Sequence, residues 1–275
     1  MKLYLPGLAA IVFLCAAPPL RAGELPDAIK KAGVLHLSIN ATYPPLDYKD
    51  PQTSKIVGLD VDLADILASK LGVKVEWTDV PFAQIIPSLT TGRTDFILSG
   101  ISDLPARRET MDFVDYLKTG AQFYTLSTSA YAAPEDLCGK RVGTIRSTRF
   151  PDDIRNWSAA HCEGAGKPAI EVVGGESSPD VRTELKQGRI DAAVQGAETI
   201  PFMSAQEGGV FKTLGAPITA VKYGIAFRKS DTAFRDLVAD TVQAMIKEGS
   251  YQKVLETWHL AAIGVTEITI NGEPR

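Results

Sequence analysis

Residues 57–72, with the sequence VGLDVDLADILASKLG, decide the fold class of this chain. Four large apolar side chains recur in it at helical spacing on one face: Leu63, Ile66, Leu67 and Leu71. Gly72 follows as a stop signal, so the stretch predicts an amphipathic helix over 60–71. Apolar runs at Val34–Ile39 and 73–77 predict a strand on either side. A helix between two strands is the repeating unit of a parallel sheet with helices on its faces.

The same alternation continues along the rest of the chain. Further strands are expected at 94–98, 122–126, Arg141–Ile145, 169–173, 190–194 and 221–227. Further helices are expected at 82–91, 105–109, 152–160, 180–187, 199–205, Thr232–Glu248 and 251–258. The two series predict an α/β protein with two lobes, each with a parallel sheet, although length and pattern also allow a single large doubly wound domain.

Local signals refine these helices. Pro87 predicts an irregular start of the helix at 82–91, and Ser102 or Asp103 is expected to cap the helix at 105–109. Gly249 is a C-cap between the last two helices. The last dozen residues are expected to be loosely held.

The first 22 residues have the three-part pattern of a secretory signal peptide. Lys2 gives the positive start, 8–17 is an uninterrupted apolar run, and Pro18 precedes a small-residue end. A membrane anchor is the alternative, but a spanning helix needs about 20 apolar residues. Leu14 before Cys15 does not fit a lipoprotein signal, and no later segment resembles a membrane span.

Charge and cysteine content narrow the class further. Loss of Lys2 and Arg21 with the signal takes the formal charge from −4 to −6, and no basic stripe predicts a nucleic-acid partner. Two cysteines remain, Cys138 and Cys162. Export to an oxidising compartment favours a disulfide between them over two separate buried thiols.

Enzyme signals are weak. His36, His161 and His259 lack metal-ligand spacing, so neither a metal nor a cofactor is expected. Residues 175–179 lack the second glycine of a nucleophile elbow. Pro168 follows a Gly-Lys pair and rules out a phosphate-binding loop there. We therefore expect no catalytic residues.

Several segments match a known family in order and spacing. They are NATYPPLD at 40–47, VGLDVDLA at 57–64, IPSLTTG at 86–92, SGIS at 99–102, RRETMDFVD at 107–115, LCGKRVG at 137–143 and GRIDAA at 188–193. From about residue 33 to 260 the chain resembles the polar amino-acid-binding receptors of ABC transporters, the bacterial solute-binding proteins of family 3.

The resemblance implies a periplasmic-binding-protein fold of type II, with two α/β lobes joined by a two-strand hinge. After the signal peptide at 1–22, lobe 1 would comprise 24–118 and the return segment 222–275. Lobe 2 would comprise 119–221, with crossings near 119–121 and 222–224.

The resemblance also implies a function. The protein would be a monomeric periplasmic receptor that closes around a small molecule, an amino acid or a derivative with a carboxylate, and delivers it to ABC transporter permease subunits. It would not be an enzyme. Two alternatives remain open: a dehydratase-like periplasmic enzyme with Glu198 as general acid, and a sensor that docks to a membrane receptor.

On the lobe 1 side, the resemblance implies a carboxylate site around Arg107, whose planar guanidinium can grip a carboxylate through two bonds. The neighbouring Arg108 is expected to point elsewhere. The wall of this pocket would be formed by Ser99, Gly100 and Ser102, and its aromatic floor and lid by Tyr43 and Phe82. Asn40 stands where receptors for basic amino acids often carry a carboxylate.

On the lobe 2 side, Ser147 and Thr148 start a helix whose amides would meet the same carboxylate. Arg149 stands where relatives have a small polar residue, and either adds a second positive contact or faces solvent. Gln195 could supply polar contacts. Many relatives carry an aspartate for the ligand's α-ammonium where this chain has Gly196. Either Glu198 replaces that aspartate, or the ligand lacks a primary ammonium.

Overall fold

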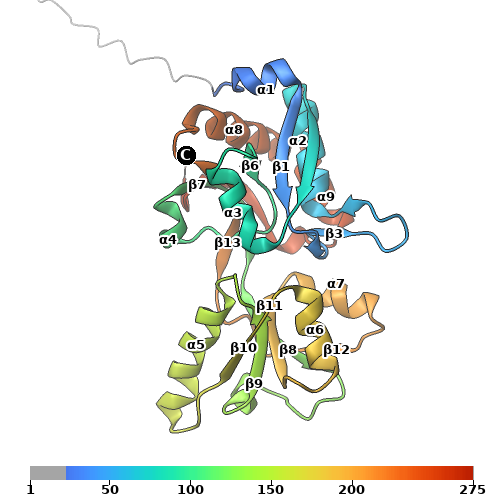
Figure 1. The fold of residues 1–275 in the computed structure, drawn as a ribbon, viewed down its shortest axis with the longest axis vertical. Helices are drawn as coiled ribbons and strands as arrows, with labels where there is room; N and C mark the ends of the chain where they lie inside the picture. The colour runs from blue at the N-terminus through green and yellow to red at the C-terminus, as the bar shows by residue number, and fades with distance from the viewer. Residues whose placement is uncertain (1–22, 275) are drawn as a thin grey trace, which may run out of the picture.

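Two separate β-sheets with flanking helices form two lobes joined by a narrow waist (Figure 1). The computed structural model describes residues 23–274. The predicted signal peptide lies outside the described residues. Within them, no helix is long and apolar enough to cross a membrane.

Lobe 1 is built on a seven-stranded sheet with the order β15-β14-β7-β13-β6-β1-β5. Its strands are β1 (Val34–Ile39), β5 (Lys74–Asp79), β6 (Phe96–Ile97), β7 (Met111–Thr119), β13 (Val221–Arg228), β14 (Gly264–Ile270) and β15 (Glu273–Pro274). A small second sheet contains β2 (Thr42–Tyr43), β3 (Asp47–Lys49) and β4 (Ile56–Val57). The helices of this lobe are α1 (Asp27–Ala32), α2 (Leu59–Leu71), α3 (Phe82–Thr90), α4 (Pro105–Arg108), α8 (Thr232–Glu248), α9 (Ser250–Thr257) and the 3-10 turn η3 (Ala261–Ile263).

Lobe 2 is built on a five-stranded sheet with the order β10-β9-β11-β8-β12. Its strands are β8 (Ala121–Leu126), β9 (Arg141–Ile145), β10 (Glu171–Gly175), β11 (Ala192–Gly196) and β12 (Phe211–Leu214). Its helices are α5 (Phe150–His161), α6 (Ser178–Lys186), α7 (Thr199–Gln206) and the 3-10 turns η1 (Pro134–Leu137) and η2 (Glu163–Ala165).

Helix α2 forms as its sequence predicts. Asp60 and Asp62 lie in its first turn, where the helix dipole favours acids. Leu63 and Leu67 are buried against the lobe 1 core. Gly72 ends the helix with a φ of 71°, a left-handed conformation that glycine adopts without steric cost.

Several predictions of local structure are wrong. Both sheets are mixed rather than parallel, because β13 pairs antiparallel with β6 and β7, and β11 pairs antiparallel with β8. The end of the chain is not loose, because β14 pairs with β7 and β15 with β14. Leu104, not Ser102 or Asp103, is the N-cap of α4. Helix α3 contains Pro87, as its sequence indicates.

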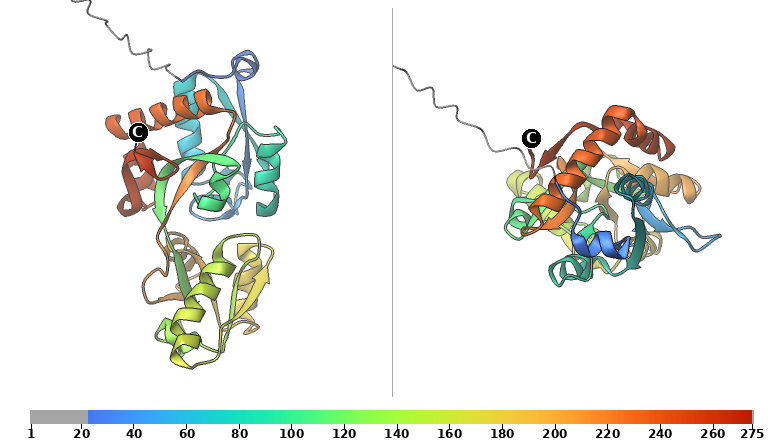
Figure 2. Two further views of the ribbon diagram at one scale, coloured as in Figure 1. Left: turned by 90° about the vertical axis from the view of Figure 1, so that its left-hand side faces the viewer. Right: turned by 90° about the horizontal axis from the view of Figure 1, so that it is seen from above.

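The chain passes between the lobes twice, and the two passages lie side by side (Figure 2). The first is at Gly120, between β7 and β8. The second is near Thr219, a few residues before the expected position, because β13 already begins at Val221. The two passages touch: the Ala121 amide donates to Thr219 Oγ1 at 2.9 Å.

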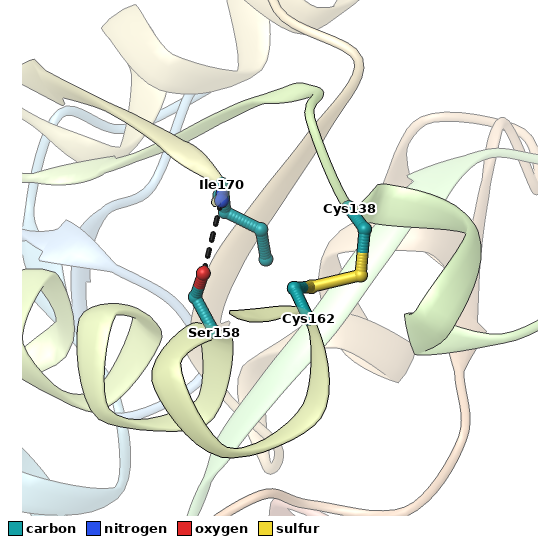
Figure 3. The surroundings of a disulfide bond; sticks show 4 residues. All are labelled: Cys138, Ser158, Cys162 and Ile170. Carbon is teal, nitrogen blue, oxygen red and sulfur yellow. Dashed lines mark hydrogen bonds between the residues drawn. A yellow bond between two sulfur atoms is a disulfide. The ribbon is translucent and has the colours of Figure 1, made fainter. Parts of the chain in front are cut away.

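The predicted disulfide between Cys138 and Cys162 is confirmed, with Cα atoms 5.4 Å apart (Figure 3). It joins the end of η1 to the end of α5. Close by, the Ile170 amide donates to Ser158 Oγ of α5 at 2.9 Å. These links hold α5, which carries one wall of the site described next, against the lobe 2 sheet.

Candidate ligand-binding site

A small cavity lies between the two lobes. Nine of the twelve predicted ligand contacts line it: Asn40, Tyr43, Phe82, Ser99, Gly100, Ser102, Arg107, Thr148 and Arg149. Four further lining residues were not predicted: Asp47, Ile145, Phe150 and Tyr223. Asp47 ends the first quoted motif and Phe150 follows Arg149, so proximity in sequence could have indicated both; no comparable signal marks Tyr223.

Arg107 enters the cavity from α4. Its Nη1 donates to the Ser102 carbonyl at 2.9 Å, which fixes the direction of the guanidinium. Burial, with a smaller contribution from the positive charge of Arg149, lowers the pKa of Arg107 to about 10. Arg108 turns away and forms two hydrogen bonds with Asp103. A half-buried cation with free donors is a suitable partner for a carboxylate.

Arg149 enters the same cavity from lobe 2, where it precedes α5. Its Nε donates to Ser102 Oγ at 3.1 Å, and its Nη1 donates to Thr219 Oγ1 at 3.0 Å and pairs with Asp153. Its Nη2 is buried without a hydrogen-bond partner. The sequence left open whether Arg149 contacts the cavity or faces solvent. In the structure it lines the cavity.

Two buried carboxyl groups support the lobe 1 wall of the cavity. Asp47 accepts a hydrogen bond from Ser99 Oγ at 2.6 Å, and Asp60 accepts one from the Gly100 amide at 2.9 Å. Gly100 has a φ of 51°, in the left-handed region that favours glycine. Because the Gly100 amide already donates to Asp60, it is not a free donor for a ligand. Burial raises the pKa of Asp47 well above its usual range and that of Asp60 to about 7.

Glu198 lies behind the cavity wall instead of in it. Its carboxylate accepts hydrogen bonds from Thr119 Oγ1 at 2.5 Å and from the Tyr223 hydroxyl at 2.9 Å. The Tyr43 hydroxyl accepts from the Gly196 amide at 2.8 Å and lies 3.3 Å from that of Tyr223. The two tyrosines, which do line the cavity, stand where they separate Glu198 from it.

Gly196 has no space for a side chain in this arrangement. A Cβ atom there would lie 2.1 Å from Glu198 Oε1 and 2.6 Å from the Tyr43 hydroxyl. Both distances are far below a van der Waals contact. The glycine therefore makes room for the Glu198–tyrosine network.

The remaining two predicted residues also lie outside the lining. Gln195 is buried inside lobe 2, where it accepts from Ser178 Oγ at 2.5 Å and donates to Thr199 Oγ1 at 2.6 Å. Ser147 is next to the cavity, but only its neighbour Thr148 lines it. The Thr148 amide donates to the Ile145 carbonyl at 3.2 Å, so it is not free for a ligand.

No group of three or more His, Cys, Asp or Glu side chains that could hold a metal ion occurs within residues 23–274. The cavity is lined by two guanidinium groups, hydroxyls, an amide, one buried carboxyl group and apolar or aromatic side chains. It is suited to holding an organic anion.

Comparisons with known proteins give a consistent picture. The family model of the bacterial extracellular solute-binding proteins, family 3, matches residues 35–261. An arginine-binding protein of Corynebacterium glutamicum is 30% identical over 252 residues, which cover 91% of this chain and 82% of that protein.

Solved structures agree. An ancestral arginine-binding protein bound to arginine is 30% identical and superposes with a TM-score of 0.74, covering 82% of this chain and 98% of that one. An ancestral amino acid-binding protein, described as a precursor of cyclohexadienyl dehydratase, is 28% identical with a TM-score of 0.75, covering 84% and 98%. All three relatives are described as binding proteins.

Proposed function

The chain belongs to the bacterial extracellular solute-binding proteins, family 3, and on this premise we propose that it is the periplasmic substrate-binding protein of an ABC importer. Its ligand is an amino acid or an amino-acid derivative with a carboxylate, in keeping with the arginine and amino-acid ligands of its relatives. The protein acts as a monomer and hands the ligand to the permease subunits. The observation that carries the proposal is a cavity between two lobes with Arg107 in its wall.

Binding proceeds by closure of the lobes. In an open form, lobe 1 presents Arg107, Tyr43 and Phe82, and the carboxylate binds there first. Lobe 2 then brings Arg149 and Phe150 over the ligand. The closed form is favoured by contacts that both lobes make at the same time, so the ligand shifts the equilibrium toward it.

The Arg107→Gln variant tests this proposal. The ligand of the unmodified protein is first identified by thermal shift across a panel of carboxylates, since a binder raises the melting temperature increasingly as its concentration exceeds Kd. Calorimetry should then show a loss of at least about 2 kcal/mol in binding free energy, roughly 30-fold in Kd, because a half-buried charged partner of the carboxylate is removed. The control is Arg93→Gln, which neutralises an exposed arginine of the same lobe. Equal affinities of the two variants would refute the assignment.

A dehydratase-like enzyme is the second candidate. Glu198 favours it in one respect, because burial raises the pKa of its carboxyl group as a general acid requires. Its position argues against it, since Tyr43 and Tyr223 lie between Glu198 and the cavity. A binding function is therefore better supported, and a direct assay for turnover of any bound ligand separates the two.

A further inference from the structure

The two arginines of the cavity approach the same residue, Ser102, from opposite lobes. Arg107 donates to the carbonyl of Ser102 at 2.9 Å, and Arg149 donates to the hydroxyl of the same residue at 3.1 Å. Two like charges brought this close repel each other, and the lowered pKa of Arg107 reflects this in part. An anion between them would remove the repulsion and occupy the unpaired Nη2 of Arg149, whose side chain is only 7% exposed.

The cavity offers a cation only one carboxyl group, against two guanidinium groups. Among its thirteen lining residues, Asp47 alone has a carboxyl group. One of its oxygens accepts from Ser99 and the other is buried without a hydrogen-bond partner, and burial raises the pKa of this group well above its usual range, which favours the neutral form. Glu198 is committed to Thr119 and Tyr223 behind the wall. Asp153 pairs with Arg149 but is not part of the lining.

The rest of the wall combines uncharged polar residues, such as Asn40 and Thr148, with apolar and aromatic ones. Phe82 comes from lobe 1, and Ile145 and Phe150 come from lobe 2. An ammonium group in this space would lose its hydration next to two guanidinium groups, and its one acidic partner, Asp47, is a group whose neutral form is favoured by burial. A neutral substituent would have no such cost.

We propose that the site selects carboxylic acids that carry no ammonium group, such as N-acylated amino acids and 2-hydroxy acids. This inference rests on the proposed function and narrows its ligand class. One carboxylate lies between Arg107 and Arg149, and the neutral body of the acid packs against Phe82 and Phe150. A zwitterionic amino acid places its ammonium next to two guanidiniums and is rejected.

The test uses matched triplets with the same side chain on the unmodified protein without its signal peptide. Phenylalanine, N-acetylphenylalanine and phenyllactate form one triplet, and the corresponding compounds of leucine, glutamate and arginine form three more. We expect at least one ammonium-free acid to bind at least about 100-fold more tightly than its parent amino acid, measured by thermal shift and calorimetry. The proposal is overturned if an amino acid binds more tightly than its ammonium-free counterparts, or if none of the ammonium-free acids binds.

A variant gives a second readout. Arg149→Gln should weaken binding of the best acid by at least about 10-fold, because a charge-assisted hydrogen bond is lost. Arg146→Gln is the matched control: Arg146 lies three residues earlier and pairs with Glu176 at the surface. Unchanged affinity of Arg149→Gln, with a melting temperature close to that of the control, would also overturn the proposal.

Failure of this inference differs from failure of the proposed function. Tight binding of a zwitterionic amino acid with a smaller radius of gyration in X-ray scattering would overturn the ligand class and leave the receptor function in place. Binding of an ammonium-free acid without any change in the radius of gyration would support the ligand class and contradict lobe closure.

Discussion

At the scale of single residues, buried carboxyl groups hold the ligand-facing loop of lobe 1. Asp60 is fully buried and accepts from the Gly100 amide and the Tyr116 hydroxyl. Asp47, on the same side, accepts from Ser99. Because both acids are buried, their protonation is linked to the stability of the loop.

This linkage predicts how Asp60 contributes to stability. Burial raises its pKa to about 7, so between roughly pH 4 and 7 the folded state binds a proton that the unfolded state does not. The stabilisation that this extra proton gives to the folded state is fully present below that window and is lost as pH rises through 7. Asp60→Asn resembles the protonated form, so wild type should lose on the order of 2–4 kcal/mol relative to this variant over the window.

Urea denaturation of both proteins at several pH values measures the difference. Asp27→Asn, at an exposed helix position, is the control and should follow wild type. Parallel pH profiles for wild type and Asp60→Asn would contradict the raised pKa.

The sequence was most informative about residues that belong to a recognisable motif. The predicted residues of the lobe 1 wall, Ser99, Gly100, Ser102 and Arg107, line the cavity in the structure. The orientation of Arg149 could not be predicted, because it depends on Thr219 and Ser102, which are distant in sequence. The sequence suggested Glu198 as a replacement acid, but the tyrosine contacts that remove it from the cavity are tertiary.

At the scale of elements, the helices and the buried strands of the β-α-β units were predictable from periodicity, as for α2 and β1. The short strands β2 to β4 and the terminal hairpin of β14 and β15 were not. Strands such as β15 contain two residues, too few for an alternating pattern, and exist through pairing with a neighbour. The order of the strands is likewise a property of their pairing and not of any one segment.

The waist gives a prediction at this scale. A Cβ atom on Gly120 would lie 2.0 Å from the Thr219 carbonyl oxygen, so any side chain there pushes the two passages apart. Gly120→Ala should lower the free energy of unfolding by about 1–3 kcal/mol, the usual cost of overpacking. In Gly164→Ala, the new atom would meet only the Ala159 carbonyl oxygen at 3.4 Å. Equal unfolding midpoints for the two variants would show that the waist tolerates a side chain.

At the scale of the whole molecule, the lobes contact each other around the cavity. Arg149 reaches Ser102 across the cavity, and Tyr43 accepts from the Gly196 amide. At the outer edge, Phe202 of lobe 2 packs edge-on against Tyr48 of lobe 1, with ring centroids 5.6 Å apart. These contacts define a closed arrangement, and ligand binding supplies the additional energy that selects it.

The two-lobed architecture was predicted from the family resemblance, and periodicity alone left a single large domain open. The ligand class could not be read from the sequence in the same way. It depends on the sum of charges that face one cavity, and these charges come from residues in both lobes, from 47 to 149.

A crystal structure of the complex with the tightest-binding acid would show the carboxylate site itself. We expect a ligand carboxylate within about 3 Å of the guanidinium nitrogens of Arg107, with Arg149 on its other side and both lobes in contact with the ligand. A carboxylate bound away from Arg107, or a ligand held by one lobe with the other apart, would contradict this expectation.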